Sequence, residues 1–313
     1  MERLSGDAPV PDALRGGVVA LGNFDGFHVG HQAVVGRALE RARAEGRPAL
    51  VVTFDPHPAR LFRPDSPPFL LTTIAQRLRL FAAFGVDGAL ALPFDQAMAA
   101  MPPQDFVRAW LHERIGAHRL VTGEDFTFGR NRGGHIDALH ALAADHGMIA
   151  EAVAPVEADG AVASSTRVRQ HLKAGDMAAA ARLLGRPFAI EGIVQHGDKL
   201  GRTIGFPTAN LALRDYLRPA YGIYAARGWL ADGRLVDGAA NLGIRPQFDP
   251  PKELLEPHFF DFSEDLYGQH LEVELIAHIR PEAKFDSLDA LIAQMAADCV
   301  EARRILAATP AAL

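Results

Sequence analysis

The pattern of apolar residues changes near residue 185, and this change limits the possible folds more than any other feature of the chain. Before it, short apolar runs alternate with stretches of helical periodicity. After it, short segments of alternating polarity are separated by turns rich in Gly, Pro and Asp. A chain of 313 residues is long enough for two cores. We therefore predict two domains, 1–184 and 185–313, with the boundary where Gly185 and Pro187 end a helix.

The first domain is predicted to be Rossmann-like, with a parallel sheet and helices on both faces. Its predicted strands are nearly continuous in apolar residues, as in parallel strands that are covered on both sides. Strands are expected at 17–22, 49–54, 88–94, 118–123 and 148–156, and helices at 30–45, 104–115 and 138–147. Ligands of such sheets bind beyond the carboxyl ends of the strands.

The second domain is predicted to be an antiparallel sheet or barrel that ends in a helix. Alternating segments lie at 188–197, 221–230, 236–243, 258–262 and 270–279, and an amphipathic helix is expected at 287–308.

Composition excludes several classes of protein. With 49% apolar and 22% charged residues, the chain has the balance of a globular enzyme. A net charge of −6 provides no global field that would attract nucleic acid or an acidic membrane, so neither is expected as a partner. Cys299 is the only cysteine, which excludes a disulfide framework and a cysteine zinc site. No apolar run approaches the ~20 residues that span a bilayer, so a cytoplasmic location is expected, and self-association is left open.

The common phosphate-binding motifs are missing from the sequence. None of the lysines follows a glycine, so there is no Walker A loop, and no GxGxxG opens a predicted helix. Any nucleotide site must therefore use another device.

One candidate is the segment GNFDGFHVGH, residues 22–31, between the first predicted strand and helix. Asn23, Asp25 and the glycines suit a tight turn. His28 and His31 stand at the helix start, where free N–H groups and the helix dipole favour an anion. Two imidazoles there could bind a triphosphate and stabilise a pyrophosphate leaving group. The alternative is an ordinary loop whose histidines are surface residues or part of a metal site.

A second candidate is SSTRVR, residues 164–169. Its hydroxyls suit a helix N-terminus or a phosphate, and Arg169 can bind phosphate oxygens through two nitrogens. By itself the segment is better explained as a capped helix.

A third candidate is GDKLGRTIGFPTANL, residues 197–211. Its glycines allow the backbone to approach phosphates closely. Thr208 and Asn210 share one face if the segment is extended, and their neutral oxygens suit Mg²⁺. Alternatively, PTAN is an ordinary turn that enters a strand.

Together these segments resemble the bacterial bifunctional riboflavin kinase/FAD synthetase family. The HxGH form resembles the signature of the nucleotidylyltransferase superfamily, and GRTIGFPTANL resembles that of riboflavin kinases; similarity extends from about residue 15 to 308. The resemblance implies an α/β nucleotidylyltransferase domain followed by a small closed β-barrel with a terminal helix. The implied reactions, with ATP and Mg²⁺, convert riboflavin to FMN and then FMN to FAD with release of pyrophosphate.

The resemblance also implies roles for individual residues. Catalysis is implied for His28, His31 and Glu256, the last as the base for the riboflavin 5′-hydroxyl. ATP or phosphate contacts are implied for Gly22, Asn23, Phe24, Asp25, Gly30, Ser164, Ser165, Thr166, Arg169, Gly197, Gly201, Gly205 and Pro207. Flavin contacts are implied for Asp55, His57, Asp125, Phe126 and Phe128, and metal ligation for Thr208 and Asn210.

Four positions depart from the family pattern: Phe27, Asp125, Gln247 and Pro257. Because Pro257 lacks a ladder donor, Glu256 is expected at a strand edge or bulge. Glu253 and Asp261 are the carboxylates to consider next if Glu256 is not the base.

Two other functions are compatible with part of this pattern. One half could be active while the other only stabilises it, or the chain could bind flavin for storage or regulation without chemistry. The presence of both motif sets argues against the first. Time-dependent release of ADP and pyrophosphate separates an enzyme from a binder.

Overall fold

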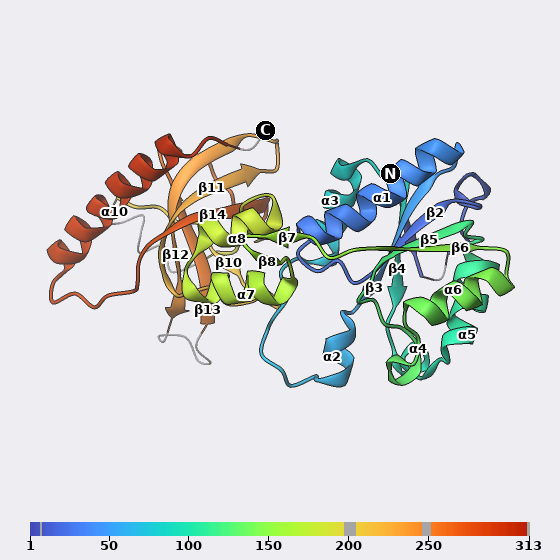
Figure 1. The fold of residues 1–313 in the computed structure, drawn as a ribbon. Helices are drawn as coiled ribbons and strands as arrows, with labels where there is room; N and C mark the ends of the chain where they lie inside the picture. Colours follow the sequence, from blue (N-terminus) through green and yellow to red (C-terminus); the bar gives the residue numbers. More distant parts are fainter. Residues whose placement is uncertain (7, 197–204, 246–251, 312–313) are drawn as a thin grey trace. The chain divides into compact units, whose positions relative to one another are not determined.

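A computed structural model describes residues 1–6, 8–196, 205–245 and 252–311 (Figure 1). The chain forms two compact units. The first comprises residues 1–67 and 72–164, and the second comprises 68–71 and 165–313. Within the described residues, no helix is long and apolar enough to cross a membrane.

The first unit contains a six-stranded parallel sheet in the order β1-β4-β3-β2-β5-β6, which confirms the predicted fold class. The strands are β1 (Glu2–Ser5), β2 (Val18–Leu21), β3 (Ala49–Asp55), β4 (Gly88–Pro93), β5 (Arg119–Gly123) and β6 (Ile149–Val153). A small hairpin follows, formed by β7 (Glu157–Ala158) and β8 (Ala161–Val162).

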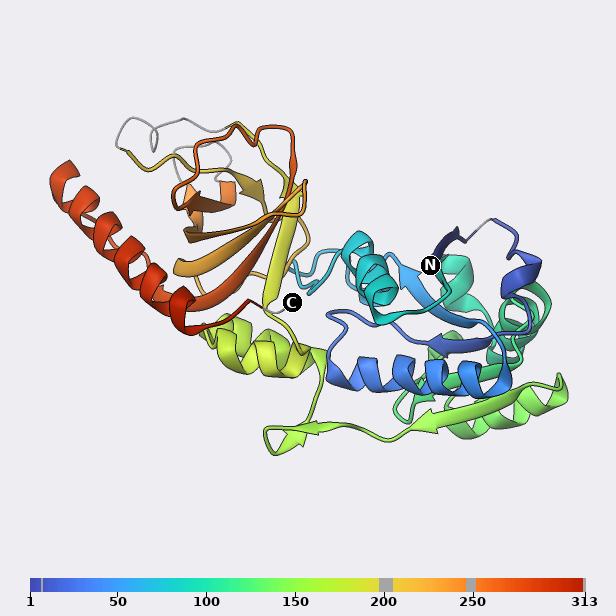
Figure 2. The same ribbon diagram turned by 90° about the horizontal axis from the view of Figure 1, so that it is seen from above.

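Helices cover both faces of this sheet (Figure 2). They are η1 (Asp12–Leu14), α1 (Val29–Glu45), α2 (Pro58–Phe62), α3 (Ile74–Phe84), α4 (Gln96–Ala100), α5 (Pro103–Phe106), the π-helical η2 (Val107–Arg114), η3 (Arg130–Arg132) and α6 (Ile136–Asp145). Successive residues of β2 alternate between two cores. Val18 and Ala20 pack with α1 and α3, whereas Val19 and Leu21 pack with η2 and α6. This double burial explains why the strands are apolar throughout.

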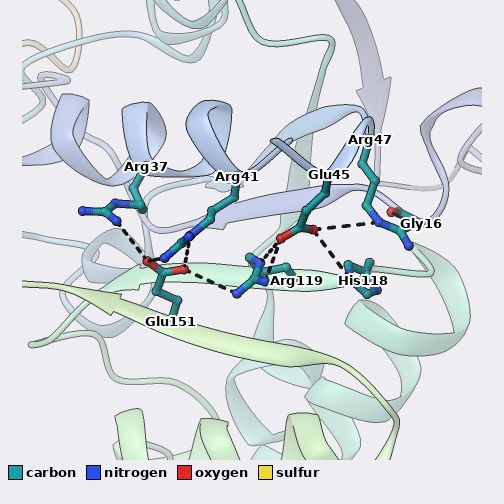
Figure 3. A network of polar contacts seen from close by, with 8 residues as sticks. All are labelled: Gly16, Arg37, Arg41, Glu45, Arg47, His118, Arg119 and Glu151. Carbon is teal, nitrogen blue, oxygen red and sulfur yellow. Dashed lines mark hydrogen bonds and ion pairs between the residues drawn. The ribbon is translucent and has the colours of Figure 1, made fainter. Parts of the chain in front are cut away.

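Charged side chains tie the edge strand β6 to helix α1 (Figure 3). Glu151 of β6 accepts hydrogen bonds from Arg41 at 2.8 and 3.0 Å and from Arg119 of β5 at 3.4 Å. Arg119 also pairs with Glu45, with Nη2 2.6 Å from the carboxylate. The network continues through Arg37, His118 and Arg47. The hydrogen bond from Arg41 is the main reason that the pKa of Glu151 lies below its usual value.

Replacing Glu151 by Gln is expected to destabilise the N-terminal unit by about 1 kcal/mol, because solvent screens the partly exposed arginines. Folding lowers the pKa of Glu151, so its ionisation stabilises the fold fully above the usual value of 4.5. That contribution is lost as the pH falls through the lower folded-state value. The difference in melting temperature between wild type and Glu151→Gln should therefore shrink below about pH 4.5.

Glu40→Gln provides the matched control for this experiment. The Glu40 side chain, also on α1, is 70% exposed and meets Arg37 at 3.5 Å. We expect this variant to melt like wild type at every pH. A Glu151→Gln difference that is independent of pH would contradict the stabilising role of the carboxylate charge.

The second unit contains a six-stranded antiparallel sheet in the order β10-β13-β12-β11-β14-β9. Its strands are β9 (Phe188–Ile193), β10 (Leu211–Ala212), β11 (Gly222–Leu230), β12 (Leu235–Arg245), β13 (Lys252–Phe259) and β14 (His270–Arg280). A bridge between Gln195 and Asn210 joins the two ends of this order, with Gln195 N 2.9 Å from Asn210 O. The sheet thus closes into a barrel, as predicted.

Helices pack on the outside of the barrel. Helix α10 (Leu288–Ala308) lies along β11, β12 and β14, and α8 (Met177–Leu184) packs against β9, β14 and α7 (Ser165–Ala174). Residues 68–71 also belong to this unit, since Leu70 N donates to Asp215 O and Leu217 N donates to Leu70 O. The packing therefore assigns α7 and α8 to the barrel, although they precede the predicted boundary at residue 185.

Candidate active sites

His28 and His31 lie together at the start of α1. His28 is the N-cap residue, and its Nδ1 accepts a hydrogen bond from Gly30 N at 3.2 Å. The two imidazole rings stack with their centroids 3.6 Å apart. A Cβ on Gly30 would lie 3.0 Å from the His28 ring, so glycine leaves room for the ring to fold over the first turn. Because Nδ1 accepts, the neutral His28 carries its proton on Nε2 and can donate from there.

The turn before these histidines is buried and held in an uncommon backbone conformation. Phe24 and Phe27 have φ values of 51° and 44°, and each is 2% exposed. Asp25 is buried too, and its Oδ1 accepts from Thr72 N at 3.0 Å and from Thr72 Oγ1 at 3.2 Å. Gly26 N donates to the same Thr72 hydroxyl at 2.9 Å. The contacts described for Asp25 therefore brace the turn, and its predicted contact with ATP stays a prediction.

Two further side chains fix the beginning of the turn. Gly22 N donates to Val52 O at 3.1 Å, which continues the pairing of β2 with β3. The Asn23 carbonyl accepts from Thr53 Oγ1 at 2.9 Å and from Arg77 Nη1 at 2.7 Å. Arg77 lies in α3, a helix that was not predicted from the sequence. A capping box from Thr73 to Gln76 marks the start of that helix and could have revealed it.

The predicted flavin residues follow the carboxyl ends of β3 and β5. Asp55 is exposed at the end of β3, and His57 is the N-cap residue of α2, with Nδ1 3.1 Å from Ala59 N. Asp125 is exposed, Phe126 is half-buried, and Phe128 is buried between Phe106 and Phe126. Phe126 and Phe128 stack with ring centroids 5.8 Å apart. Phe126 is thus the more accessible of the two rings, and the flavin contacts of these residues stay predictions.

The SSTRVR segment crosses from one unit to the other. Ala163 O lies 3.5 Å from the position of a Cβ on Gly30, which places Ser164 beside the HxGH turn. Helix α7 begins at Ser165, so Ser165, Thr166 and Arg169 belong to the second unit. Arg169 Nε donates to Phe69 O at 2.9 Å, and the guanidinium lies 5.6 Å from the Phe69 ring centroid.

In the barrel, strand register aligns three polar residues. The pairing of β12 with β13 sets Asn241 opposite Glu256. On the other side, Leu211 pairs with Leu255, and Ala209 N donates to Pro257 O at 2.9 Å, so Asn210 falls opposite Glu256. Directly opposed residues of antiparallel strands project to the same face with Cβ atoms about 4.5–5.5 Å apart. Asn210 and Glu256, predicted from distant motifs, are therefore neighbours.

Asn241 is a candidate site residue that the sequence analysis did not single out. Its Oδ1 is buried and accepts no hydrogen bond from the described part of the chain. Asn241 lies between Ala240 and Leu242, which are both buried in the barrel wall. An amide side chain between two such apolar residues is the sequence feature that could have indicated it.

The remaining residues of the third motif are only partly described. Gly205 has φ 86°, Pro207 is exposed, and Thr208 is half-buried. His258 Nδ1 lies 2.8 Å from Pro207 O and holds this segment against β13. The predicted phosphate contacts Gly197 and Gly201, and the departure at Gln247, lie outside the described residues.

The expectation that Glu256 lies at a strand edge or bulge is wrong. Strand β13 pairs regularly with β12 on one side and with residues 209–212 on the other. The Pro257 carbonyl still accepts a hydrogen bond from Ala209 N. Proline lacks only the N–H that would donate back to the Ala209 carbonyl. The strand tolerates this loss beside the short strand β10.

The reserve candidate Glu253 is occupied by other contacts. Arg218 Nε and Nη2 lie 2.8 and 2.7 Å from its carboxylate, and the Tyr221 hydroxyl donates to it. The hydrogen bond from Arg218 keeps the pKa of Glu253 below its usual range, while burial raises the pKa of Tyr221 to about 12. A carboxylate held in this way is a poor proton acceptor. Asp261 is exposed and pairs with Arg303 at 2.9 Å.

The fold combines a parallel α/β unit, with paired histidines at a helix start, and an antiparallel barrel, with Asn210 and Asn241 opposite Glu256. Comparison with known proteins identifies the class. The family model of FAD synthetase matches residues 10–167, and that of riboflavin kinase matches residues 184–306. The chain belongs to the bifunctional riboflavin kinase/FMN adenylyltransferase family. It phosphorylates riboflavin to FMN and transfers AMP from ATP to FMN, which yields FAD and pyrophosphate.

Similar proteins cover nearly the whole chain. The bifunctional riboflavin kinase/FMN adenylyltransferase of Escherichia coli (strain K12) is 40% identical over 294 residues, 94% of each chain. The protein of the same description from Pseudomonas fluorescens is 42% identical over 294 residues, again 94% of each. A crystal structure described as a macrolide-efflux protein from Streptococcus pneumoniae is 32% identical, with a TM-score of 0.85 over 97% of this chain and 99% of that one.

Proposed function

We propose that the two reactions are divided between the domains, with adenylyl transfer at the HxGH turn and riboflavin phosphorylation at the Asn210–Glu256 row. The observation that carries this division is that the proposed catalytic residues of each reaction lie within one unit. His28 and His31 stack at one helix start, and Asn210 and Glu256 are aligned by one sheet. The family models divide the chain in the same order.

In adenylyl transfer, an FMN phosphate oxygen attacks the α-phosphorus of ATP, and the bond to pyrophosphate breaks. The chain must therefore bind the triphosphate and stabilise the charge that develops on the leaving group. His28 and His31 donate from their imidazoles at the helix start, where the dipole also favours an anion. Ser164 adds a hydroxyl beside this turn, and the phosphate contacts of Ser165, Thr166 and Arg169 stay predictions of the sequence. The aromatic edge with Phe126 binds the flavin ring.

In riboflavin phosphorylation, the oxygen of the 5′-hydroxyl attacks the γ-phosphorus of ATP, and Glu256 accepts the proton of that hydroxyl. The bond between the γ-phosphorus and the β–γ bridging oxygen breaks, which releases ADP. Phosphoryl transfer depends mainly on positioning and on neutralising charge, so one well-placed carboxylate suffices as the base. Glu256 qualifies because the register places it beside Asn210 and because the competing Glu253 is engaged by Arg218.

The residues of the PTAN segment fit a divalent metal. Thr208 is half-buried and Asn210 is 7% exposed, and both offer the neutral oxygens that Mg²⁺ accepts alongside phosphate oxygens and water. Among the described residues, no group of three His, Cys, Asp or Glu could hold a metal ion. Bound there, Mg²⁺ would neutralise phosphate charge. Thr208 and Asn210 orient the ATP phosphates toward Glu256.

Two truncated chains test the division of labour. A fragment of residues 165–313 is expected to fold and to make FMN but no FAD. A fragment of residues 185–313, which begins at the predicted boundary, should also make FMN but should melt at a lower temperature. It lacks Met177, Leu183 and Leu184, which are buried in α8 and stabilise the fold by roughly 1.5–3 kcal/mol each.

The measurements are thermal unfolding and chromatography of the flavins after incubation with riboflavin, ATP and Mg²⁺. Formation of FAD by either fragment would overturn the proposed division. If the shorter fragment is as stable as the longer one, α7 and α8 do not support the barrel. A cytoplasmic location and self-association stay predictions of the sequence.

A further inference from the structure

Arg77 stands out as a buried cation that neither motif set includes. Its side chain lies in α3, the residue is 1% exposed, and within the described part of the chain no carboxylate forms an ion pair with it. Its Nε is buried without a hydrogen-bond partner in the same described part. Burial lowers the pKa of Arg77, and the charges of Asp25 and Asp55 oppose this effect. The guanidinium of arginine keeps its proton in proteins, so the side chain carries a positive charge in this buried position.

The contacts of Arg77 converge on the beginning of the HxGH turn. Its Nη1 donates to Asn23 O at 2.7 Å and approaches Thr53 Oγ1 at 3.2 Å. Thr53 donates to the same carbonyl at 2.9 Å, so two donors fix one backbone atom. Phe24 is the next residue, and its ring meets the His31 ring at 5.3 Å between centroids. Asn23 is therefore connected to His31 through Phe24, and a displacement of Asn23 is expected to move the His31 ring.

Helix α3 supports the same turn at two other places. Phe81 packs against Phe24 and Phe27, with ring centroids 5.8 and 5.1 Å apart. Thr72, two residues before the helix, binds Asp25 and Gly26. The packing alone would hold a neutral side chain at position 77. A cation there carries a cost of burial that an apolar residue avoids, and that cost falls when an anion binds nearby.

We propose that Arg77 is a positioning residue for adenylyl transfer, which holds Asn23 and places an unpaired positive charge behind the turn that receives the ATP triphosphate. This inference rests on the assignment of adenylyl transfer to the HxGH turn. The hydrogen bond sets the geometry of the turn. The charge favours the triphosphate before reaction and the pyrophosphate as it leaves.

The test uses the full chain and compares Arg77→Met, Arg77→Lys and Thr53→Val. Arg77→Met removes the charge and the donor but keeps a long side chain, and kcat/KM for ATP in FAD formation should fall on the order of 10²-fold. Arg77→Lys keeps the charge and should lose about tenfold. Thr53→Val removes the other donor to Asn23 but no charge, so kcat/KM for ATP should fall less than in Arg77→Lys.

Three readouts separate positioning from a general role in folding. Inhibition by inorganic pyrophosphate should weaken in Arg77→Met in parallel with ATP, but the KM for FMN should not change. Riboflavin phosphorylation by the same chain reports an intact protein and should stay at the wild-type rate. Wild-type ATP and pyrophosphate parameters in Arg77→Met would overturn the proposal, and so would equal losses for ATP and FMN together with a lower melting temperature.

Two further comparisons cover a failure of Arg77→Met to fold and an error in the assignment of the site. If Arg77→Met does not fold, Arg77→Lys decides, because an unchanged KM for ATP in that variant would overturn the inference. His28→Asn tests the assignment of the site separately. FAD formation that survives His28→Asn would refute the site itself, whereas its loss beside a fully active Arg77→Met would refute only the role of Arg77.

Discussion

Replacing Glu256 by Gln is expected to abolish most riboflavin phosphorylation and leave the binding of riboflavin and ATP intact. The substitution keeps the shape and hydrogen-bonding capacity of the side chain but removes the basic carboxylate. General-base contributions run to roughly 10²–10⁴-fold, and the fall in kcat should lie in that range. Rates of ADP release and equilibrium binding of riboflavin are the measurements.

Two comparisons make this result specific. Asn210→Ala should weaken binding of the Mg²⁺–nucleotide as well as turnover, because it removes a proposed ligand that is only 7% exposed. FAD synthesis from supplied FMN should survive both changes, since we assign that reaction to the other unit. Near-normal phosphorylation by Glu256→Gln would refute the base. Asp261, whose ion pair with Arg303 is exposed, would then be the next candidate, ahead of Glu253, which both Arg218 and Tyr221 bind.

Loss of the imidazole at position 28 or 31 is expected to reduce FAD formation by roughly 10²–10³-fold, with FMN formation near normal. At position 28, Asn is a sharper substitution than Ala. His28 caps α1 through its bond to Gly30 N, and Asn is among the best N-cap residues. His28→Asn therefore keeps the helix start while it removes the phosphate-binding group.

The companion variant His31→Ala leaves the cap untouched and should show a similar loss. Both rates are measured in one chain by chromatography of FMN and FAD. If either variant lost the two activities equally, the histidines would support the fold and not the transfer of AMP.

Much of the fold could be predicted because its strands are buried on both faces or alternate regularly. Strand β2 and helix α1 begin and end within a residue of their predicted limits. Strand β1 was not predicted, because its residues 2–5 are mostly polar and its pairing with β4 involves a segment far along the chain. Packing at the domain junction could not be predicted either. Helices α7 and α8 carry no signal in sequence that assigns them to the barrel.

Sequence motifs indicated the candidate site residues of both units. For the kinase site, the pairing of the antiparallel sheet showed which of these residues are neighbours. No spacing along the chain relates Asn210 to Glu256, since only the register of β13 with its two neighbours brings them together. Arg77 shares a helix face with Phe81 and Phe84, at positions where a core helix normally carries apolar residues. An arginine among these apolar positions is the sequence feature that could have indicated a special role. That role depends on a contact with Asn23, which lies 54 positions away in the sequence.

The bridge between Gln195 and Asn210, which closes the barrel, also has a consequence for solubility. Open edges of antiparallel sheets offer unpaired N–H and C=O groups to other chains and promote aggregation. Here the residues that close the edge belong to the segment that carries Thr208 and Asn210, the proposed partners of the nucleotide. A substitution that disturbs this segment exposes two strand edges as well as impairing a reaction. Variants of the kinase site should therefore be checked for aggregation before their activities are compared.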